Sequence, residues 1–427
     1  MKGRSKTGRR EFIRGVAAAG TAAWMAQWLT ACSTAARHPA VGGRWTGWTP
    51  GEFQVHFIYT GVAESQFFIF PDGTTMLLDC GDHPACLRGD KAVKILPSQD
   101  RHAGEWIARY VTRVNPNGTD VDYMLLSHFH SDHSGNGSFH VGRTTGRNPD
   151  YFLSGFAHAA ETLRFRKAID RGWPDYADPI PYDDGPKGSL TNMKALYAYL
   201  AKRDGLKVEK FRLGARDQIV PLRGAAEGFK TFNFAVNGRL CSPKTGEVID
   251  PYRERIAQGA KRLNENAMST GTLFTYGDFT YFAAGDLSDK ISREGRQLED
   301  ELAKIMPKVD VAKINHHGHH SMFVPLAKAL DARCYVACVW DQLHCTGDTM
   351  AALEQGPGEH VYFPGIVPTW EIRDGVRPPW MAKAAAPCWE GAHTVLSVRP
   401  GGREYSMTLL SAADETMTVR GVMEFRT

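Results

Sequence analysis

The pattern of apolar and polar positions predicts a series of strands in the first half of the chain. Residues 53–82, FQVHFIYTGVAESQFFIFPDGTTMLLDCGD, alternate apolar and polar positions as half-buried strands do. A Pro-Asp-Gly turn at 71–73 predicts a tight hairpin between two of these strands. Residues 102–113 have apolar positions at helical spacing, and the apolar run in 121–130, VDYMLLSHFH, is too short for a helix. That run predicts a buried strand whose carboxyl end carries histidines.

The rest of the chain continues this mixture of helices and strands. The pattern predicts helices at 157–171, 189–203, 288–305 and 325–331, and strands at 229–236, 271–286 (two, joined by a Gly-Asp turn), 309–315, 334–340 and 393–427 (two or three). A second short apolar strand, in VDVAKINHHGHHS, again ends in histidines. We therefore expect one α/β domain over 52–427, with an insertion at roughly 141–265.

Charge is concentrated at the amino terminus. The formal net charge is +4, but the first 31 residues alone contribute +5, which leaves the remainder close to neutral at −1. A strongly basic nucleic-acid-binding surface is therefore not implied.

The first 31 residues predict an export signal. A basic region, RREFIR at 9–14, is followed by a short apolar stretch rich in Ala and Gly. Arg9 and Arg10 resemble a twin-arginine signal, and the sequence LTAC, which ends at Cys32, resembles a lipobox. We expect a lipid on Cys32, a tether at 32–51, and a periplasmic protein anchored to the inner or outer membrane. The alternative is a short amphipathic helix with a buried cysteine.

Seven cysteines follow Cys32, and their spacing matches no zinc knuckle or ribbon. An odd number leaves at least one thiol without an intrachain partner. We expect buried cysteines with one or two disulfides at most.

The first histidine-rich strand end predicts a metal site. His128, His130, Asp132 and His133 place four ligand-type side chains within six positions, HFHSDH. Neutral imidazole and carboxylate bind zinc and similar divalent ions. Alternation in an extended segment points His128 and His130 the same way, and the turn beyond brings Asp132 and His133 toward a second ion. The alternative for each histidine alone is a solvated loop residue.

This motif, HxHxDH, resembles the signature of the metallo-β-lactamase superfamily, an αββα sandwich with its metal site at one edge. Asp79 in MLLDCGD and Asp286 in YFAAGDLS fall where that superfamily has an aspartate. The element His316-His317-Gly318 and the run NENAMSTGTLFTYGDFTYFAAGD resemble its ComEC-like branch, which also includes a phosphorylcholine esterase. The resemblance covers roughly 53–350 and is interrupted by the middle insertion.

The resemblance implies two divalent metal ions, with zinc expected. The metal ligands it implies are His128, His130, Asp132, His133, Asp286 (as the bridge) and one of His316 and His317, of which we choose His317. Asp132 also belongs to the catalytic set, together with Asp79, which orients a ligand histidine, and His316 and His344, which act near the substrate. His344 lies in DQLHC, where the branch usually has Asn-x-Tyr-Gly-His-Pro.

A further histidine often completes the first metal site in this superfamily. Between HxHxDH and Gly285-Asp286 the chain has only His140 and His158. His158 is one candidate for this ligand, with a surface role as the alternative, and Asp170 is an alternative oxygen ligand or an outer partner.

These residues together predict a hydrolase. A metal-bound hydroxide would attack a phosphorus or carbonyl centre. The branch favours phosphodiesters, either nucleic acid or a phosphorylcholine-type head group, and the near-neutral body favours a small or polymer-linked diester. A lactone or acyl ester is the second candidate, and a surface binding lipoprotein with a vestigial metal site is the third. Trp173, Tyr176 and Tyr182 are candidates to line a cleft, with a place in the core as the alternative.

Overall fold

The computed structural model describes residues 40–83, 94–135, 137, 150–341, 343–355, 360–362 and 391–427. The expected export signal and Cys32 lie outside these residues. Of the expected tether, the part from residue 40 onward is described. There the backbone N–H of Trp45 donates to Met417 O at 2.9 Å, and Trp45 is buried. This part of the expected tether therefore packs onto the carboxyl-terminal strands.

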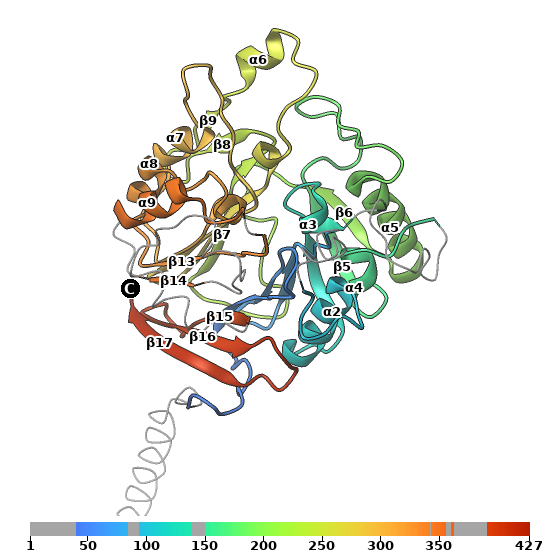
Figure 1. Ribbon diagram of the computed structural model, residues 1–427, viewed down its shortest axis with the longest axis vertical. Helices are drawn as coiled ribbons and strands as arrows, with labels where there is room; N and C mark the ends of the chain where they lie inside the picture. The colour runs from blue at the N-terminus through green and yellow to red at the C-terminus, as the bar shows by residue number, and fades with distance from the viewer. Residues whose placement is uncertain are drawn as a thin grey trace, which may run out of the picture. The chain divides into compact units, whose positions relative to one another are not determined.

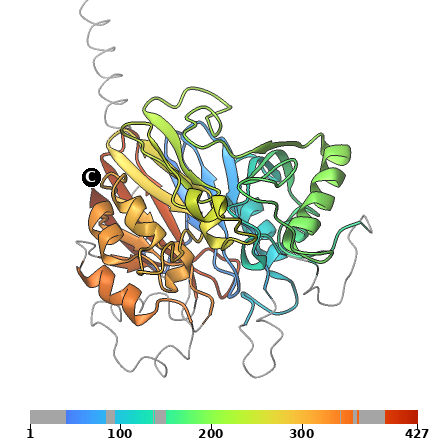
Figure 2. The ribbon, with the colours of Figure 1, turned by 90° about the horizontal axis from the view of Figure 1, so that it is seen from above.

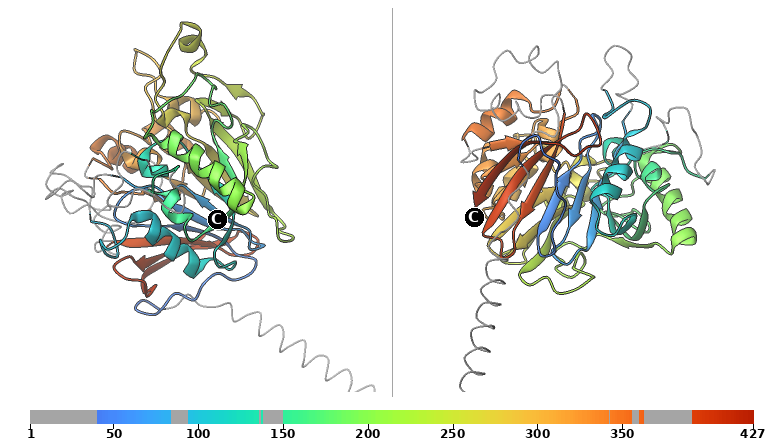
Figure 3. Two further views of the ribbon diagram at one scale, coloured as in Figure 1. Left: turned by 90° about the vertical axis from the view of Figure 1, so that its right-hand side faces the viewer. Right: turned by 90° about the horizontal axis from the view of Figure 1, so that it is seen from below.

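A nine-stranded sheet of mixed direction organises one half of the described fold. Its order is β17-β16-β15-β1-β2-β3-β4-β5-β6, antiparallel from β17 to β3 and parallel from β3 to β6. Figure 3 shows the carboxyl-terminal strands (red) beside the first strands (blue). Its strands are β1 (Phe53–Phe57), β2 (Gln66–Ile69), β3 (Thr75–Leu78), β4 (Asp120–Leu125), β5 (Arg164–Asp170), β6 (Lys207–Lys210), β15 (Ala392–Val398), β16 (Glu404–Ser411) and β17 (Val419–Arg426).

An eight-stranded sheet organises the other half. Its order is β14-β13-β12-β11-β10-β7-β8-β9, parallel from β14 to β11 and antiparallel beyond. Its strands are β7 (Phe229–Val236), β8 (Arg239–Cys241), β9 (Val248–Ile249), β10 (Gly271–Tyr276), β11 (Phe279–Ala284), β12 (Val311–Lys313), β13 (Cys334–Val336) and β14 (His360–Tyr362).

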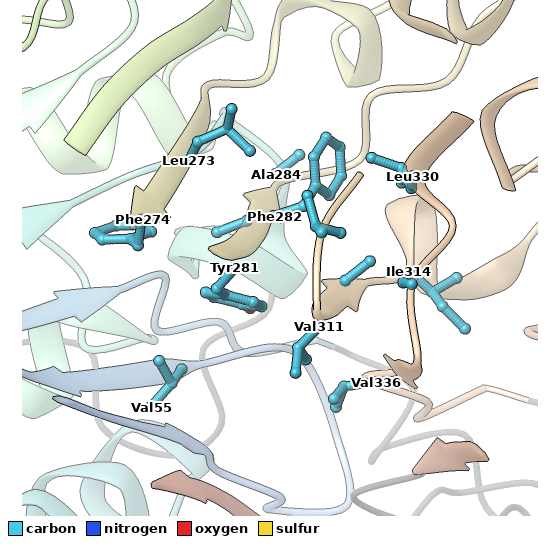
Figure 4. Packing of buried hydrophobic residues seen from close by; sticks show 14 of the residues in the cluster. Val55, Leu273, Phe274, Tyr281, Phe282, Ala284, Val311, Ile314, Leu330 and Val336 are labelled. Atoms are coloured by element: carbon cyan, nitrogen blue, oxygen red, sulfur yellow. The ribbon is translucent and has the colours of Figure 1, made fainter. Parts of the chain in front are cut away.

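Side chains of both sheets share one apolar core. Phe68 of β2 lies 4.9 Å from Phe274 of β10 and 6.2 Å from Tyr281 of β11, measured between ring centroids. Figure 4 shows Val55 facing Phe274 and Tyr281, while Phe282 points the other way, toward Leu330 of α8. Because both faces of these strands are buried, their sequences are nearly continuous apolar runs.

Helices cover the outer faces of the two sheets. α2 and α5 belong to the apolar cluster that includes Phe67 and Leu77 of the first sheet, and α7, α8 and α9 contribute to the cluster of the second. Figures 1 and 2 show α5 and the helices α7 to α9 on opposite sides of the strands. The helices are α2 (Ala103–Val114), α3 (Ser131–Ser134), α4 (Phe156–Ala159), α5 (Ser189–Asp204), α6 (Arg253–Ala257), α7 (Leu298–Ala303), α8 (Val324–Leu330) and α9 (Gly347–Gln355), with 3-10 turns η4 (Asn266–Met268) and η5 (Asn315–Gly318).

The mixed α/β class predicted from sequence is confirmed, but two of the predicted helices are wrong. Over 157–171 the chain forms only the short α4 and then β5, in which exposed Arg164 and buried Phe165 alternate beside β4. Over 288–305 only α7 is helical. The segment expected as an insertion contributes β5 and β6 to the first sheet and β7, β8 and β9 to the second.

Among the described residues, every helix is too short or too polar to span a bilayer.

Candidate metal centre

The candidate centre forms where two pairs of parallel strands end, one pair in each sheet. Asp79 follows β3, the segment His128–His133 follows β4, Asp286 follows β11, and His317 follows β12. Since β3 pairs in parallel with β4, and β11 with β12, the carboxyl ends of each pair point to the same edge of its sheet. Ligand sites in α/β proteins form at such edges, because the loops there are free to carry polar side chains.

His128 and His130 point to the same side of the extended segment, as alternation predicts. His128 is fully buried, and its Nε2 lies 3.0 Å from His130 Nδ1. Phe129, which lies between them in sequence, is buried in the apolar cluster that the first sheet shares with α2 and α5. Its backbone N–H donates to Glu265 Oε1 at 2.9 Å, so a side chain 136 residues away fixes the backbone that carries both histidines.

Asp132 and His133 lie on the short helix α3. His133 Nε2 lies 3.2 Å from Asp286 Oδ2 and 3.3 Å from His317 Nε2. Asp132 Oδ2 lies 3.1 Å from the same His317 nitrogen. One turn of helix therefore brings two ligand-type side chains against residues more than 150 positions away.

Asp79 lies behind the histidines and accepts hydrogen bonds from the segment that carries them. Its Oδ1 accepts from Ser127 N at 2.7 Å, and its Oδ2 accepts from Ser127 Oγ and from His133 Nδ1, each at 2.7 Å. With the proton of His133 on Nδ1, Nε2 is the nitrogen that faces Asp286 and His317.

Two groups of donor atoms are close enough to hold metal ions. One comprises His128, His130 and Asp286, and the other comprises Glu64, His133, Asp286 and His317. Asp286 is common to both, and its Oδ1 is buried without a hydrogen bond from any described residue. The donor set of imidazole nitrogens and carboxylate oxygens suits zinc and similar divalent ions. These buried groups can hold a metal ion.

Sequence reasoning missed two buried charges behind the centre, Glu64 and Lys313. Lys313 Nζ lies 3.0 Å from Glu64 Oε2 and 3.7 Å from Asp286 Oδ1, and it donates to Gly285 O at 2.9 Å. Glu64 Oε2 also lies 3.4 Å from His317 Nδ1. A lysine inside the apolar strand VDVAKIN was the available signal, because buried lysines require a partner.

The electrostatics of the cluster favour charged carboxylates and protonated His133 and His317, but a neutral His128. Burial opposes charge on His133, but Asp286, Asp132 and Asp79 outweigh it and raise the pKa of His133 well above its usual value. Burial likewise opposes charge on His317, but Asp286 and Asp132 raise its pKa to about 9. For His128, burial and the neighbouring histidines lower the pKa well below the usual value. His128 is therefore a neutral imidazole with a lone pair available.

His316 and His344 lie beside His317. Asn266 Nδ2 donates to His316 Nε2 at 3.0 Å, so the ring proton lies on Nδ1 and faces Ser288 Oγ at 3.0 Å. Burial lowers the pKa of His316 to about 4. The ring of His344 stacks on that of His317 with centroids 4.6 Å apart. Its Nδ1 accepts from the backbone N–H groups of Trp340 and Asp341, so Nε2 carries the proton of the neutral ring.

Asp170 and His158 lie outside both groups. Asp170 accepts hydrogen bonds from the N–H groups of Gly172 and Trp173 and from the Tyr176 hydroxyl, so it closes the turn after β5. Burial raises its pKa. His158 on α4 lies instead with Asp82 and His102 in a third group of potential ligands.

A cavity of about 400 Å³ opens at the centre and is lined by His83, Phe129, His130, Ser131, Asp132, Tyr182, Asp184, Gly188 and Ser189. Of the three aromatics expected to line a cleft, Tyr182 does so, Tyr176 is buried in the core, and Trp173 packs edge-on against Tyr197. Tyr182 also borders a second cavity of about 350 Å³ beside Arg171 and Glu265.

No model of a known protein family and no curated protein matches this sequence.

Proposed function

We propose that this chain is a hydrolase with two metal ions that cleaves phosphodiesters, with the fold of the metallo-β-lactamase superfamily and the ComEC-like branch as its nearest type. The observation that carries the proposal is that Asp286 belongs to both groups of donor atoms. A carboxylate within reach of two groups of donors suits a pair of metal ions about 3.5–4 Å apart. The HxHxDH segment supplies His128 and His130 to one group and His133 to the other, and His317 supplies the second group's other nitrogen.

His128, His130 and Asp286 would hold one ion. His133, His317 and Asp286 would hold the other, with Glu64 as the fourth donor of that group. Asp132, whose Oδ2 lies 3.1 Å from His317 Nε2, is a further proposed ligand of the second ion. When bound, two such ions supply an activated water and offset the negative charge that develops on the substrate. Zinc suits this imidazole and carboxylate set.

The surrounding side chains orient the metal ligands and the substrate. Asp79 keeps the proton of His133 on Nδ1, which directs Nε2 into the centre. Asp132 is held by its place on α3, with one oxygen toward His317. His344, with its proton on Nε2, is suited to donate a hydrogen bond to an oxygen of the substrate. His316 has both ring nitrogens engaged and so supports the loop that carries His317.

The volume and lining of the cavity, with the near-neutral charge of the chain after residue 31, support a small phosphodiester as the substrate class. The cavity beside His130 and Asp132 is small and mostly polar, and one aromatic ring, Tyr182, borders it. A small or polymer-linked diester, such as a phosphorylcholine-type head group, fits such a volume better than duplex nucleic acid does.

We further propose that the protein is exported by the twin-arginine route and anchored by a lipid on Cys32, where its substrate would be a component of the cell envelope. Growth with labelled palmitate tests this part separately. The wild type should incorporate the label into the mature protein, and Cys32→Ser should not.

Metal-dependent turnover tests the activity. His130→Ala and Asp132→Ala should abolish hydrolysis of bis-p-nitrophenyl phosphate while the circular dichroism spectrum is retained. His320→Ala is the matched control, because His320 is an exposed histidine on the same loop as His317 and pairs with Asp348 at 2.8 Å. A phosphorylcholine ester and a lactone are tested as further substrates. Unchanged turnover in the two variants, or cleavage of the lactone alone, would overturn the proposal.

A further inference from the structure

A third group of potential ligands lies on the helical side of the first sheet and shares no residue with the candidate centre. It comprises Asp82, just beyond β3, His102 at the start of α2, and His158 on α4. The Nδ1 atoms of His102 and His158 each lie 3.9 Å from Asp82 Oδ2. Three segments separated in sequence thus converge with two imidazoles and one carboxylate.

The group is mostly buried and incompletely satisfied. Asp82 and His158 are 6% and 5% exposed, and His158 Nδ1 makes no hydrogen bond to any described residue. Nearly all buried polar groups of native proteins are paired, so a buried nitrogen without such a hydrogen bond points to a ligand. Asp82 Oδ2 receives a long hydrogen bond from Ser154 Oγ at 3.4 Å.

A glycine lets the two helices that carry these histidines approach each other closely. A Cβ at Gly104 of α2 would lie 2.2 Å from Gly155 O and 2.8 Å from the Cβ of His158. Glycine at this position therefore allows α2 to approach α4 closely enough for His102 and His158 to stack, with ring centroids 4.4 Å apart.

We propose that Asp82, His102 and His158 bind one divalent metal ion of the zinc type, separate from the dinuclear centre. Ligand atoms on a tetrahedral zinc ion lie about 3.3 Å apart, given bonds of about 2.0–2.1 Å. The 3.9 Å separations found here need only a small inward shift. The two rings, inclined by 20°, must also turn so that both nitrogens face one ion. His102 is 22% exposed at the start of α2, and its rotation would exchange the contact of its side chain with the Glu105 backbone for the ion.

The ion would have a structural role with a consequence for the centre nearby. The backbone N–H of Asp82 donates to Ser131 O at 2.8 Å, at the first residue of α3. An ion that fixes Asp82 against α2 and α4 would therefore also fix the start of the helix that carries Asp132 and His133. Three protein ligands leave a fourth position for water, as in open zinc sites.

Metal content tests the proposal. The full chain is loaded with zinc, freed of excess metal by gel filtration and measured by inductively coupled plasma mass spectrometry. His102→Ala and His158→Ala should each contain one ion fewer per chain than the wild type. His320→Ala, an exposed histidine outside all three groups, should contain as much as the wild type. The two variants should also lose part of the rise in melting temperature that zinc gives the wild type.

A third variant, Asp286→Asn, separates this site from the proposed function. It should lose ions from the dinuclear centre and keep the ion at His158. If Asp286→Asn leaves the metal content unchanged while His158→Ala lowers it, the dinuclear proposal fails and the third site stands. Equal metal content in the wild type, His102→Ala and His158→Ala would overturn the third site. Because His102 is partly exposed, its variant remains informative even if His158→Ala fails to fold.

Discussion

The buried pair of Arg171 and Glu265 should couple the stability of the fold to the position of the metal ligands. Arg171 Nε and Nη2 donate to Glu265 Oε1 and Oε2 at 2.7 and 2.6 Å, and the two side chains are 1% and 6% exposed. The same Oε1 accepts from Phe129 N, between His128 and His130. Removing either charge leaves the other buried without a partner, which costs about 3–5 kcal/mol.

The double variant distinguishes this pair from two independent contacts. Replacing both charges by apolar side chains, as Arg171→Met with Glu265→Leu, is often neutral in itself. Two partners then remain unsatisfied, Phe129 N–H and the Asn237 Oδ1 that Arg171 Nη1 contacts at 3.2 Å, at about 1–3 kcal/mol each. We therefore expect the double variant to lose about 2–6 kcal/mol, whereas the sum of the single losses is about 6–10 kcal/mol.

Urea unfolding of the four proteins measures the coupling, and zinc affinity measures the position of the ligands. Glu265→Gln keeps an oxygen acceptor for Phe129 N, so it should bind zinc more tightly than Glu265→Leu. The double variant should lose less stability than the sum of the two single losses, but it should not regain the zinc affinity of the wild type. Additive losses of stability would refute the coupling. A double variant with wild-type zinc affinity would refute the role of Glu265 in holding Phe129.

Three further results are expected. The metal-free protein should lose stability as pH rises from about 6.5 through about 9. The pKa of His317 is raised in the folded protein from its ordinary value of 6.5 to about 9, so the stability that protonated His317 contributes is complete only below pH 6.5. Thermal melts in EDTA at pH 6, 8 and 9.5 check this. Lys313→Met should destabilise the metal-free protein by about 3–5 kcal/mol, because it leaves the carboxylates of Glu64 and Asp286 buried without their positive partner. Melts with and without zinc should show that zinc raises the stability of this variant more than that of the wild type. Gly81→Ala should lower zinc content and melting temperature, because its Cβ would lie 1.8 Å from Asp132 O, whereas Gly224→Ala, with open space around it, should behave as the wild type.

Local signals predict the parts of the fold and of the candidate centre that lie near one another in sequence. The strand before His128 and the strand before His317 are both short apolar runs that end in ligand-type residues. A buried strand tolerates such residues only at its end, so the pattern predicts both β4 and β12. The same reasoning failed at 157–171, where apolar residues at 165, 168 and 169 fit a helix as well as a strand. Pairing with β4 favoured the strand, and a single segment does not reveal its neighbour.

Long-range contacts explain what the sequence did not predict. Glu64 lies 249 positions before its partner Lys313, and Glu265 lies 94 positions after Arg171. A charged side chain in a loop is expected on the surface unless its partner is known. His158 is the opposite case, a residue to which the sequence assigned the wrong partners. Its sequence context suggested a ligand for the first metal. The structure brings it to His102 and to Asp82, the last residue of MLLDCGD, and the sequence suggested no ligand role for either.

The charges around the candidate centre link its folding to its chemistry. Asp79, Asp132 and Asp286 converge on His133, and burial of such carboxylates is tolerated only beside positive charge. Protons on His133 and His317 supply that charge in the metal-free protein. A divalent cation supplies it more strongly and needs the same nitrogens deprotonated, so metal binding and proton release are one equilibrium. The carboxylates that stabilise protonated His133 and His317 would therefore also stabilise a bound cation. We expect the metal affinity of the candidate centre to rise with pH, because the cation and the protons compete for the same nitrogens.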